Sequence, residues 1–115
     1  MILDSISGLV ALCGDAEKRM IEKMVLNAAD YVQAVVAMKT TSFNYTGSAG
    51  EDLRDHMERT DKKRRSTHDA LISYVDIVNR LCVAHDYPPI YTGGEARREY
   101  GDFAIQLVNE IFEIR

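Results

Sequence analysis

The sequence predicts an all-α protein, a helical bundle of about four helices of which one is long. Apolar side chains recur at steps of three and four residues along four stretches, the pattern of amphipathic helices. No stretch alternates apolar and polar side chains as a half-buried strand does. The 115 residues, 46% hydrophobic and 28% charged, suffice for one core. We therefore expect residues 1–115 to form a single helical-bundle domain.

Two helices are predicted on either side of Gly14. Gly14 is suited to end the first helix as a left-handed terminator. Asp15 can then cap a second helix, whose apolar stripe extends from Met20 to Val36. The apolar face of the first helix consists of Ile2, Leu3, Ile6, Leu9, Val10 and Cys13. The pattern leaves open whether Gly14 separates two helices or bends one.

Residues 40–50 are predicted to form a loop. Thr, Ser, Asn and Gly dominate this segment, and these residues favour turns or compete with helical hydrogen bonds. We expect Phe43 and Tyr45 to pack the loop against the bundle.

A long third helix is predicted over residues 51–84, and a fourth helix follows Gly93 and Gly94. The third helix should end before Pro88 and Pro89, because proline cannot continue a helix. The predicted apolar face of the fourth helix consists of Ala96, Tyr100, Phe103, Ala104, Leu107, Val108, Ile111 and Phe112.

The length of the third helix is a geometric constraint. At ~1.5 Å per residue, residues 51–84 span roughly 51 Å. A compact domain of this size has a radius of gyration of only about 13 Å. The helix must kink, overhang the bundle, or pack against a second copy of the chain. The last possibility predicts a homodimer.

The charge distribution argues against nucleic acid and anionic membranes as partners. The chain has 18 acidic and 14 basic residues, interspersed, with a formal net charge of -4. The basic run at residues 62–65 points around most of a helical circumference and has no interleaved aromatic residues. A DNA-associated regulator, which would rest on this run alone, is therefore the weakest hypothesis.

Several further features predict a cytoplasmic protein without cofactor or metal. The amino terminus lacks the basic region of a signal peptide, and no apolar run approaches the ~20 residues that cross a bilayer. Cys13 and Cys82 are too few for a disulfide framework and lack metal-ligand spacing. His56 and His68 would lie ~18 Å apart along one helix. We therefore expect no membrane association, no cofactor and no metal site.

One helical face changes from apolar to polar halfway along the third helix. Its carboxyl half carries Leu71, Val75, Val78 and Cys82, and steps of three or four residues lead back to polar side chains. These candidate site residues are Asp61, Arg64, Arg65, His68 and Asp69.

Three interpretations of this polar face remain open. It can be a solvated, salt-bridged surface, or a buried polar network that fixes a helix register or a dimer partner. It can also be an anion or nucleotide site, in which Arg64 and Arg65 hold phosphate oxygens and His68 acts as acid or base.

The segment Arg64-Arg65-Ser66-Thr67-His68-Asp69-Ala70-Leu71-Ile72, followed by Tyr91-Thr92-Gly93-Gly94, resembles a family of small bacterial all-helical proteins known only as a domain of unknown function. The resemblance covers most of the chain. It implies the helical fold and a bacterial source, and it brings no activity with it.

A second resemblance is to HEPN ribonucleases, helical bundles whose dimers join an arginine and a histidine into an RNA-cutting site. That resemblance implies catalytic roles for Arg64 and His68. Here three residues separate the two, fewer than in that family, and Arg65 stands where a polar residue usually follows the arginine.

Two hypotheses about function follow. The preferred one is a non-enzymatic helical bundle that acts through contacts with an unknown protein partner or a second copy of itself. The alternative is a HEPN-like, metal-independent ribonuclease or a nucleotide- or anion-binding protein that uses Arg64, Arg65 and His68, with Asp61 and Asp69 as orienting groups.

Overall fold

The computed structural model describes residues 1–44, 50–92 and 98–113, and within these ranges the chain forms helices and no strand. The helices are α1 (Ile2–Val10), α2 (Asp15–Asn44), α3 (Gly50–Ala84) and α4 (Arg98–Glu113). The predicted all-α fold with one long helix is confirmed. Besides the 35-residue α3, α2 is also long, at 30 residues.

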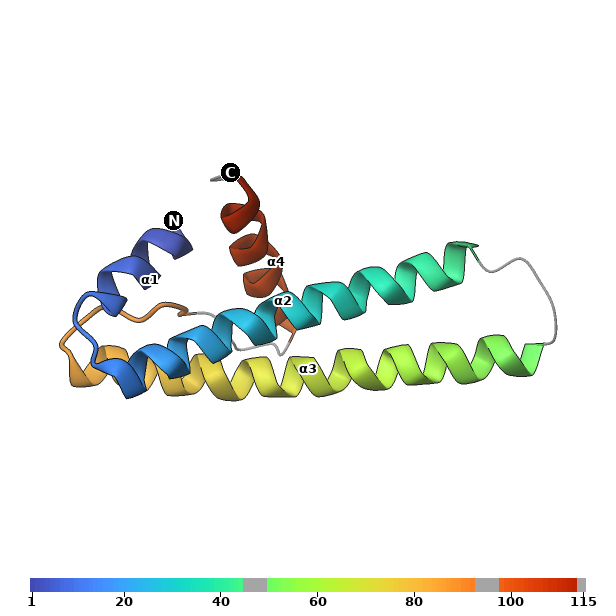
Figure 1. Ribbon diagram of the computed structural model, residues 1–115, viewed down its shortest axis with the longest axis horizontal. Helices are drawn as coiled ribbons and strands as arrows, with labels where there is room; N and C mark the ends of the chain where they lie inside the picture. The colour runs from blue at the N-terminus through green and yellow to red at the C-terminus, as the bar shows by residue number, and fades with distance from the viewer. Residues whose placement is uncertain (45–49, 93–97, 114–115) are drawn as a thin grey trace.

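The helices α2 and α3 form an antiparallel pair, and α1 and α4 lie on one side of it near the end where α3 finishes (Figure 1). We call the covered part the closed half: α1, α4, residues 15–35 of α2 and residues 64–84 of α3. The remaining residues, 36–44 of α2 and 50–63 of α3, extend past α4 as a two-helix arm.

This arm explains how the molecule accommodates a third helix that is longer than a compact domain of this size. The helix α3 runs without interruption, and the molecule measures 55 × 28 × 27 Å. Its radius of gyration is 16.4 Å, above the about 13 Å of a compact domain of this size. The excess length of α3 therefore overhangs the closed half, with α2 alongside it.

The apolar core lies in the closed half. There α3 buries Leu71, Val75, Val78 and Cys82 in one cluster with side chains from every other helix. The side chains with no exposed surface include Leu9 of α1, Met24 of α2 and Leu107 of α4. Because each buried side chain of this size stabilises the fold by about 1.5–3 kcal/mol, the closed half supplies most of the stability.

The turn between α1 and α2 corrects two predictions. Gly14 has no left-handed backbone. Instead, α1 ends at Val10, with the Leu12 amide donating to the Leu9 carbonyl and the Cys13 amide to the Val10 carbonyl. Gly14 is the amino-terminal cap of α2, a role predicted for Asp15, because its carbonyl accepts the first helical bond, from the Lys18 amide. The two helices are separate.

The end of α3 is set by Asp86 rather than by the prolines. Asp86 has a left-handed backbone, with φ of 54°. Its amide donates to the Val83 carbonyl and the Tyr87 amide donates to the Cys82 carbonyl, which is a Schellman ending. The prediction that the third helix ends at about residue 84, before Pro88, is confirmed, but Asp86 rather than proline forms the ending.

Two glycines let the covering helices approach closely. The hydroxyl end of Tyr87, which donates to the Ser5 carbonyl at 2.8 Å, occupies the space that a Cβ on Gly8 would need. Likewise a Cβ on Gly101 of α4 would lie 2.7 Å from the Tyr31 hydroxyl oxygen. A side chain at either point would require the tyrosine or the helix to shift.

The prediction of a loop over residues 40–50 is wrong in part. The helix α2 continues to Asn44, so a loop from residue 40 is wrong, because pairing with α3 outweighs weak local preferences. The packing of Phe43 and Tyr45, and the segment from Gly93 to Ala96, fall outside the described residues and side chains.

On α4 the core side chains Phe103, Ala104 and Leu107 are buried as predicted, but Phe112 is 62% exposed. The last turn of α4 projects away from the α2–α3 pair (Figure 1).

Candidate functional sites

The polar face of α3 brings three of its five candidate residues together. The Arg64 guanidinium donates from Nε (3.1 Å) and Nη2 (2.8 Å) to Asp61 Oδ1. Arg65 Nε lies 3.1 Å from the other oxygen, Asp61 Oδ2. The hydrogen bond from Arg64 lowers the pKa of the Asp61 carboxyl. Two guanidinium groups thus share one carboxylate.

The other two candidates point elsewhere. The His68 ring packs against Tyr31 of α2, with ring centroids 5.3 Å apart, and the Asp69 side chain is exposed. The Arg64 side chain is 30% exposed and the Arg65 side chain 65% exposed. Because Asp61 already occupies both guanidinium groups, this geometry favours a salt-bridged network over a preformed anion site.

A shallow groove opens where the closed half meets the arm. It has a volume of about 570 Å³ and lies between α2, α3 and the carboxyl end of α4. Its walls are mainly apolar, with Val36 55% exposed and Phe112 62% exposed. The lining residues are Ala29, Val32, Gln33, Ala34, Val36, Ala37, Thr60, Lys63, Val108 and Phe112. Sequence patterns missed this groove because they assigned Phe112 to the core.

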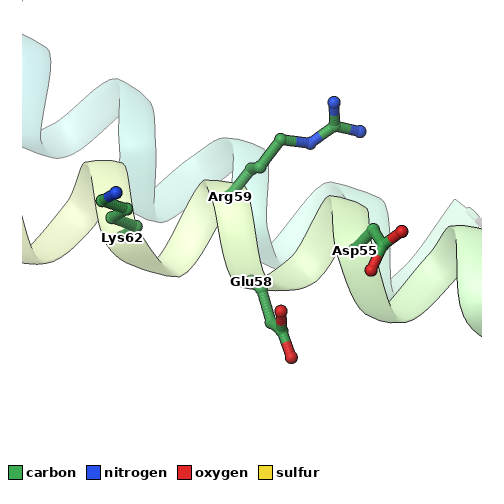
Figure 2. A pocket seen from close by; sticks show the side chains of 4 residues that line it. All are labelled: Asp55, Glu58, Arg59 and Lys62. Atoms are coloured by element: carbon green, nitrogen blue, oxygen red, sulfur yellow. The ribbon is translucent and has the colours of Figure 1, made fainter.

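A second, charged surface lies on the arm portion of α3. Asp55, Glu58, Arg59 and Lys62 line a pocket there of about 540 Å³ (Figure 2). Their spacing of three and four residues places them along one helical face. Two acidic side chains precede two basic ones, so an antiparallel copy of this stripe would place acids opposite bases.

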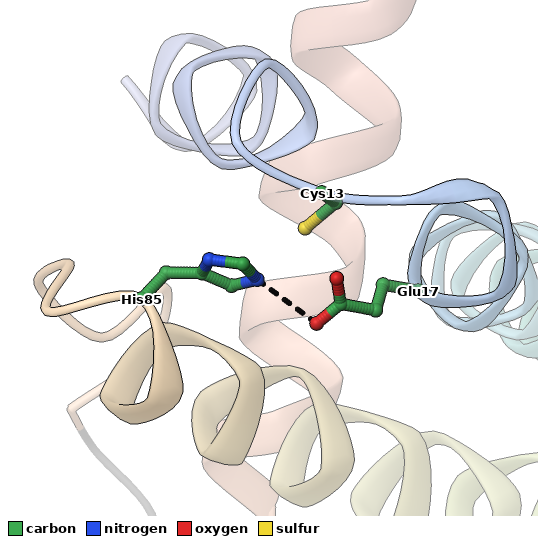
Figure 3. Close-up of side chains that lie close together, drawn as sticks. All are labelled: Cys13, Glu17 and His85. Atoms are coloured by element: carbon green, nitrogen blue, oxygen red, sulfur yellow. Dashed lines mark hydrogen bonds and ion pairs between the residues drawn. The ribbon is translucent and has the colours of Figure 1, made fainter.

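A third cluster joins three segments at the opposite end of the molecule: Cys13 from the α1–α2 turn, Glu17 from the first turn of α2 and His85 after α3 (Figure 3). His85 Nε2 lies 2.9 Å from Glu17 Oε2. The other carboxylate oxygen, Oε1, accepts the Gly14 amide at 3.1 Å. One ligand-type atom from each of the three side chains lies within 4.8 Å of the other two.

The electrostatics of this cluster favour the protonated form of the Cys13 thiol. Burial raises the pKa of Cys13, and the nearby Glu17 carboxylate raises it further. The Gly14 amide lowers the pKa of Glu17, and the hydrogen bond with His85 lowers it further. A thiolate nucleophile needs the opposite trend in the cysteine pKa, so a Cys–His catalytic pair is disfavoured.

No sequence signal identified this cluster. Glu17 and His85 are 68 positions apart, and only the antiparallel pairing of α2 with α3 brings the start of one beside the end of the other. The expectation of no metal site was based on the spacing of possible ligands along the chain. That spacing cannot reveal a cluster whose residues come from distant segments.

The described helices and surfaces define a small all-α protein with a closed half and a protruding arm. None of the helices in the described ranges is both long and apolar enough to cross a membrane. The chain belongs to the family described as protein of unknown function DUF3232, whose model matches residues 3–115. This confirms the resemblance to an uncharacterised family, whereas the bacterial source and the HEPN similarity stay predictions. No curated protein and no solved structure matches the chain.

Proposed function

We propose that this protein acts through protein–protein contacts rather than catalysis, and that its groove is the interface of a symmetric homodimer. The observation that carries the proposal is the exposed apolar surface where the cover of α4 ends. There Val36 and Phe112 remain more than half exposed beside small alanine side chains. Exposed apolar surface of this kind marks interaction sites.

The origin of this surface lies in the mismatch between α2 and α3. The apolar stripe of α2 continues through Val32 and Val36, whereas α3 turns polar at His68 and Arg64. Among the described side chains, α3 therefore offers the α2 stripe few apolar partners beyond this point. A second copy would offer the same surface in return, as a twofold interface requires.

Sedimentation of groove variants tests this proposal. We expect Val36→Glu to raise the dimer dissociation constant at least about tenfold, because it places a charge in an apolar interface. Val83→Glu is the matched control, since Val83 is 77% exposed on α3 but lies outside the groove. A wild-type chain that stays monomeric at high concentration, or equal effects of both substitutions, would overturn the groove interface.

The charged stripe on α3 offers a competing dimer contact that the same experiment separates. In an antiparallel pair, Glu58 faces Arg59 of the other copy and Asp55 faces Lys62. A dimer built on this stripe weakens with salt and with Glu58→Arg, and Glu58→Arg combined with Arg59→Glu restores it. A groove dimer responds to none of these changes.

The alternative hypothesis, a ribonuclease or a nucleotide-binding protein that uses Arg64, Arg65 and His68, stays a prediction. The hydrogen bonds of Arg64 to Asp61 weigh against it, because a phosphate would have to displace the carboxylate. RNA cleavage or a nucleotide-induced thermal shift that His68→Ala abolishes would support it over the contact role.

A further inference from the structure

The cluster of Cys13, Glu17 and His85 has the chemical composition of a transition-metal site. Thiolate sulfur, imidazole nitrogen and carboxylate oxygen are the three ligand types that Zn²⁺ takes in proteins, at about 2.0–2.3 Å from the metal. Ligand atoms around a tetrahedral Zn²⁺ therefore lie about 3.3–3.8 Å apart. The three atoms here lie within 4.8 Å of one another, so small side-chain shifts suffice to close the site.

The backbone on either side of these side chains is already fixed. The Cys13 amide donates to the Val10 carbonyl at 3.1 Å, directly after α1. Glu17 is held by the Gly14 amide at the start of α2. His85 lies within the hydrogen-bonded ending of α3, its amide donating to the Leu81 carbonyl at 3.1 Å. Little conformational freedom is left to lose on binding, which favours affinity.

We propose that Cys13, Glu17 and His85 bind a divalent transition metal, with Zn²⁺ as the preferred ion. On binding, the Cys13 thiol releases its proton to solvent and its sulfur bonds to the metal. A ring nitrogen of neutral His85 and a carboxylate oxygen of Glu17 complete the protein ligands, so their mutual hydrogen bond gives way to two metal bonds. Thiolate and carboxylate together balance the charge of the ion.

The surroundings of the site support this ligand set. The Gly14 amide remains on the Glu17 carboxylate, where it orients the ligand from the outer shell. Three protein ligands leave a fourth tetrahedral position for water. The soft sulfur and the imidazole exclude Mg²⁺ and Ca²⁺ as preferred ions, because both favour all-oxygen sites. The bound metal would join the α1–α2 turn to the end of α3.

Calorimetric titration of the full chain with Zn²⁺ tests the site, with Co²⁺ as a spectroscopic probe. We expect one metal ion per chain, a rise in melting temperature with Zn²⁺, and a thiolate-to-cobalt charge-transfer band. Each of Cys13→Ser, Glu17→Gln and His85→Gln should weaken binding by at least about tenfold, and Cys13→Ser should also abolish the band.

Matched controls carry the same side chains away from the cluster. Glu22→Gln removes an exposed carboxylate from α2 and His68→Ala removes an imidazole from α3, and both should bind Zn²⁺ as the wild type does. Circular dichroism shows whether each variant folds. If one ligand variant fails to fold, the other two and the cobalt band of the wild-type chain decide. Absence of binding to the wild-type chain, or unchanged affinity in the folded ligand variants, would overturn the site.

Discussion

The closed half and the arm are built from the same two helices, yet among the side chains that the structure describes only those of the closed half form an apolar core. Along α3, seven-residue steps lead from Val78 and Leu71, which are fully buried, to Arg64 and Met57, which are not. On α2 the apolar stripe continues as far as Val36, which lines the groove with Thr60 and Lys63 of α3. The extent of the core is therefore decided by α3, at the step from Leu71 to Arg64. Helix formation continues past that point, whereas none of the described side chains of α3 beyond it is buried.

The largest expected difference between the two regions is the cost of truncating that stripe. Leu71→Ala removes a side chain with no exposed surface and should lower the free energy of unfolding by about 2–5 kcal/mol. Met57→Ala, two heptads earlier and 37% exposed, should cost less than about 1 kcal/mol. Urea denaturation at low protein concentration measures both. Equal losses would mean that the arm is packed as tightly as the closed half.

A smaller effect is expected from the contact that fastens α1 to α4 in the closed half. Glu110 is only 5% exposed, and its Oε1 accepts the Leu3 amide at 3.0 Å. Glu110→Gln should cost about 1 kcal/mol at neutral pH, since a charged acceptor is lost. Glu113→Gln, an exposed change one turn later on α4, is the control and should have little effect.

The same carboxylate gives the closed half a pH dependence. The hydrogen bond from the Leu3 amide lowers the pKa of Glu110 in the folded protein. Its contribution to stability is therefore complete above the ordinary glutamate pKa and is lost as pH falls through the lower, folded value. Denaturation curves of the wild type and Glu110→Gln should converge in that acidic range. A constant difference at all pH values would contradict this assignment.

The smallest effect is a gain in stability at the end of α3. Asp86 holds a left-handed backbone that glycine adopts without strain, so Asp86→Gly should stabilise the closed half by about 0.5–1 kcal/mol. Asp86→Ala, which keeps a Cβ but lacks the short polar side chain with which aspartate tolerates this backbone, should destabilise it. Thermal unfolding distinguishes the two. A loss with glycine would mean that the aspartate side chain contributes more than the backbone costs.

The sequence predicts features that depend on nearby residues, and it fails where distant helices decide. The helical stretches and the end of α3 before Pro88 follow from local spacing and chain chemistry. The role of Gly14 does not, since the same residue can end one helix or cap the next. Whether Phe112 is buried depends on how far α4 continues beyond the point where it crosses α2. The cluster around Cys13 exists only because α2 and α3 are antiparallel.

The close contacts at Gly8 and Gly101 restrict which residues homologues can carry at these positions. Each glycine receives a tyrosine from another segment, Tyr87 in the first case and Tyr31 in the second. A homologue with alanine at either position must turn that tyrosine aside, hold its first or last helix farther out, or carry a shorter side chain opposite. We therefore expect the glycine and the tyrosine of each contact to change together among homologues.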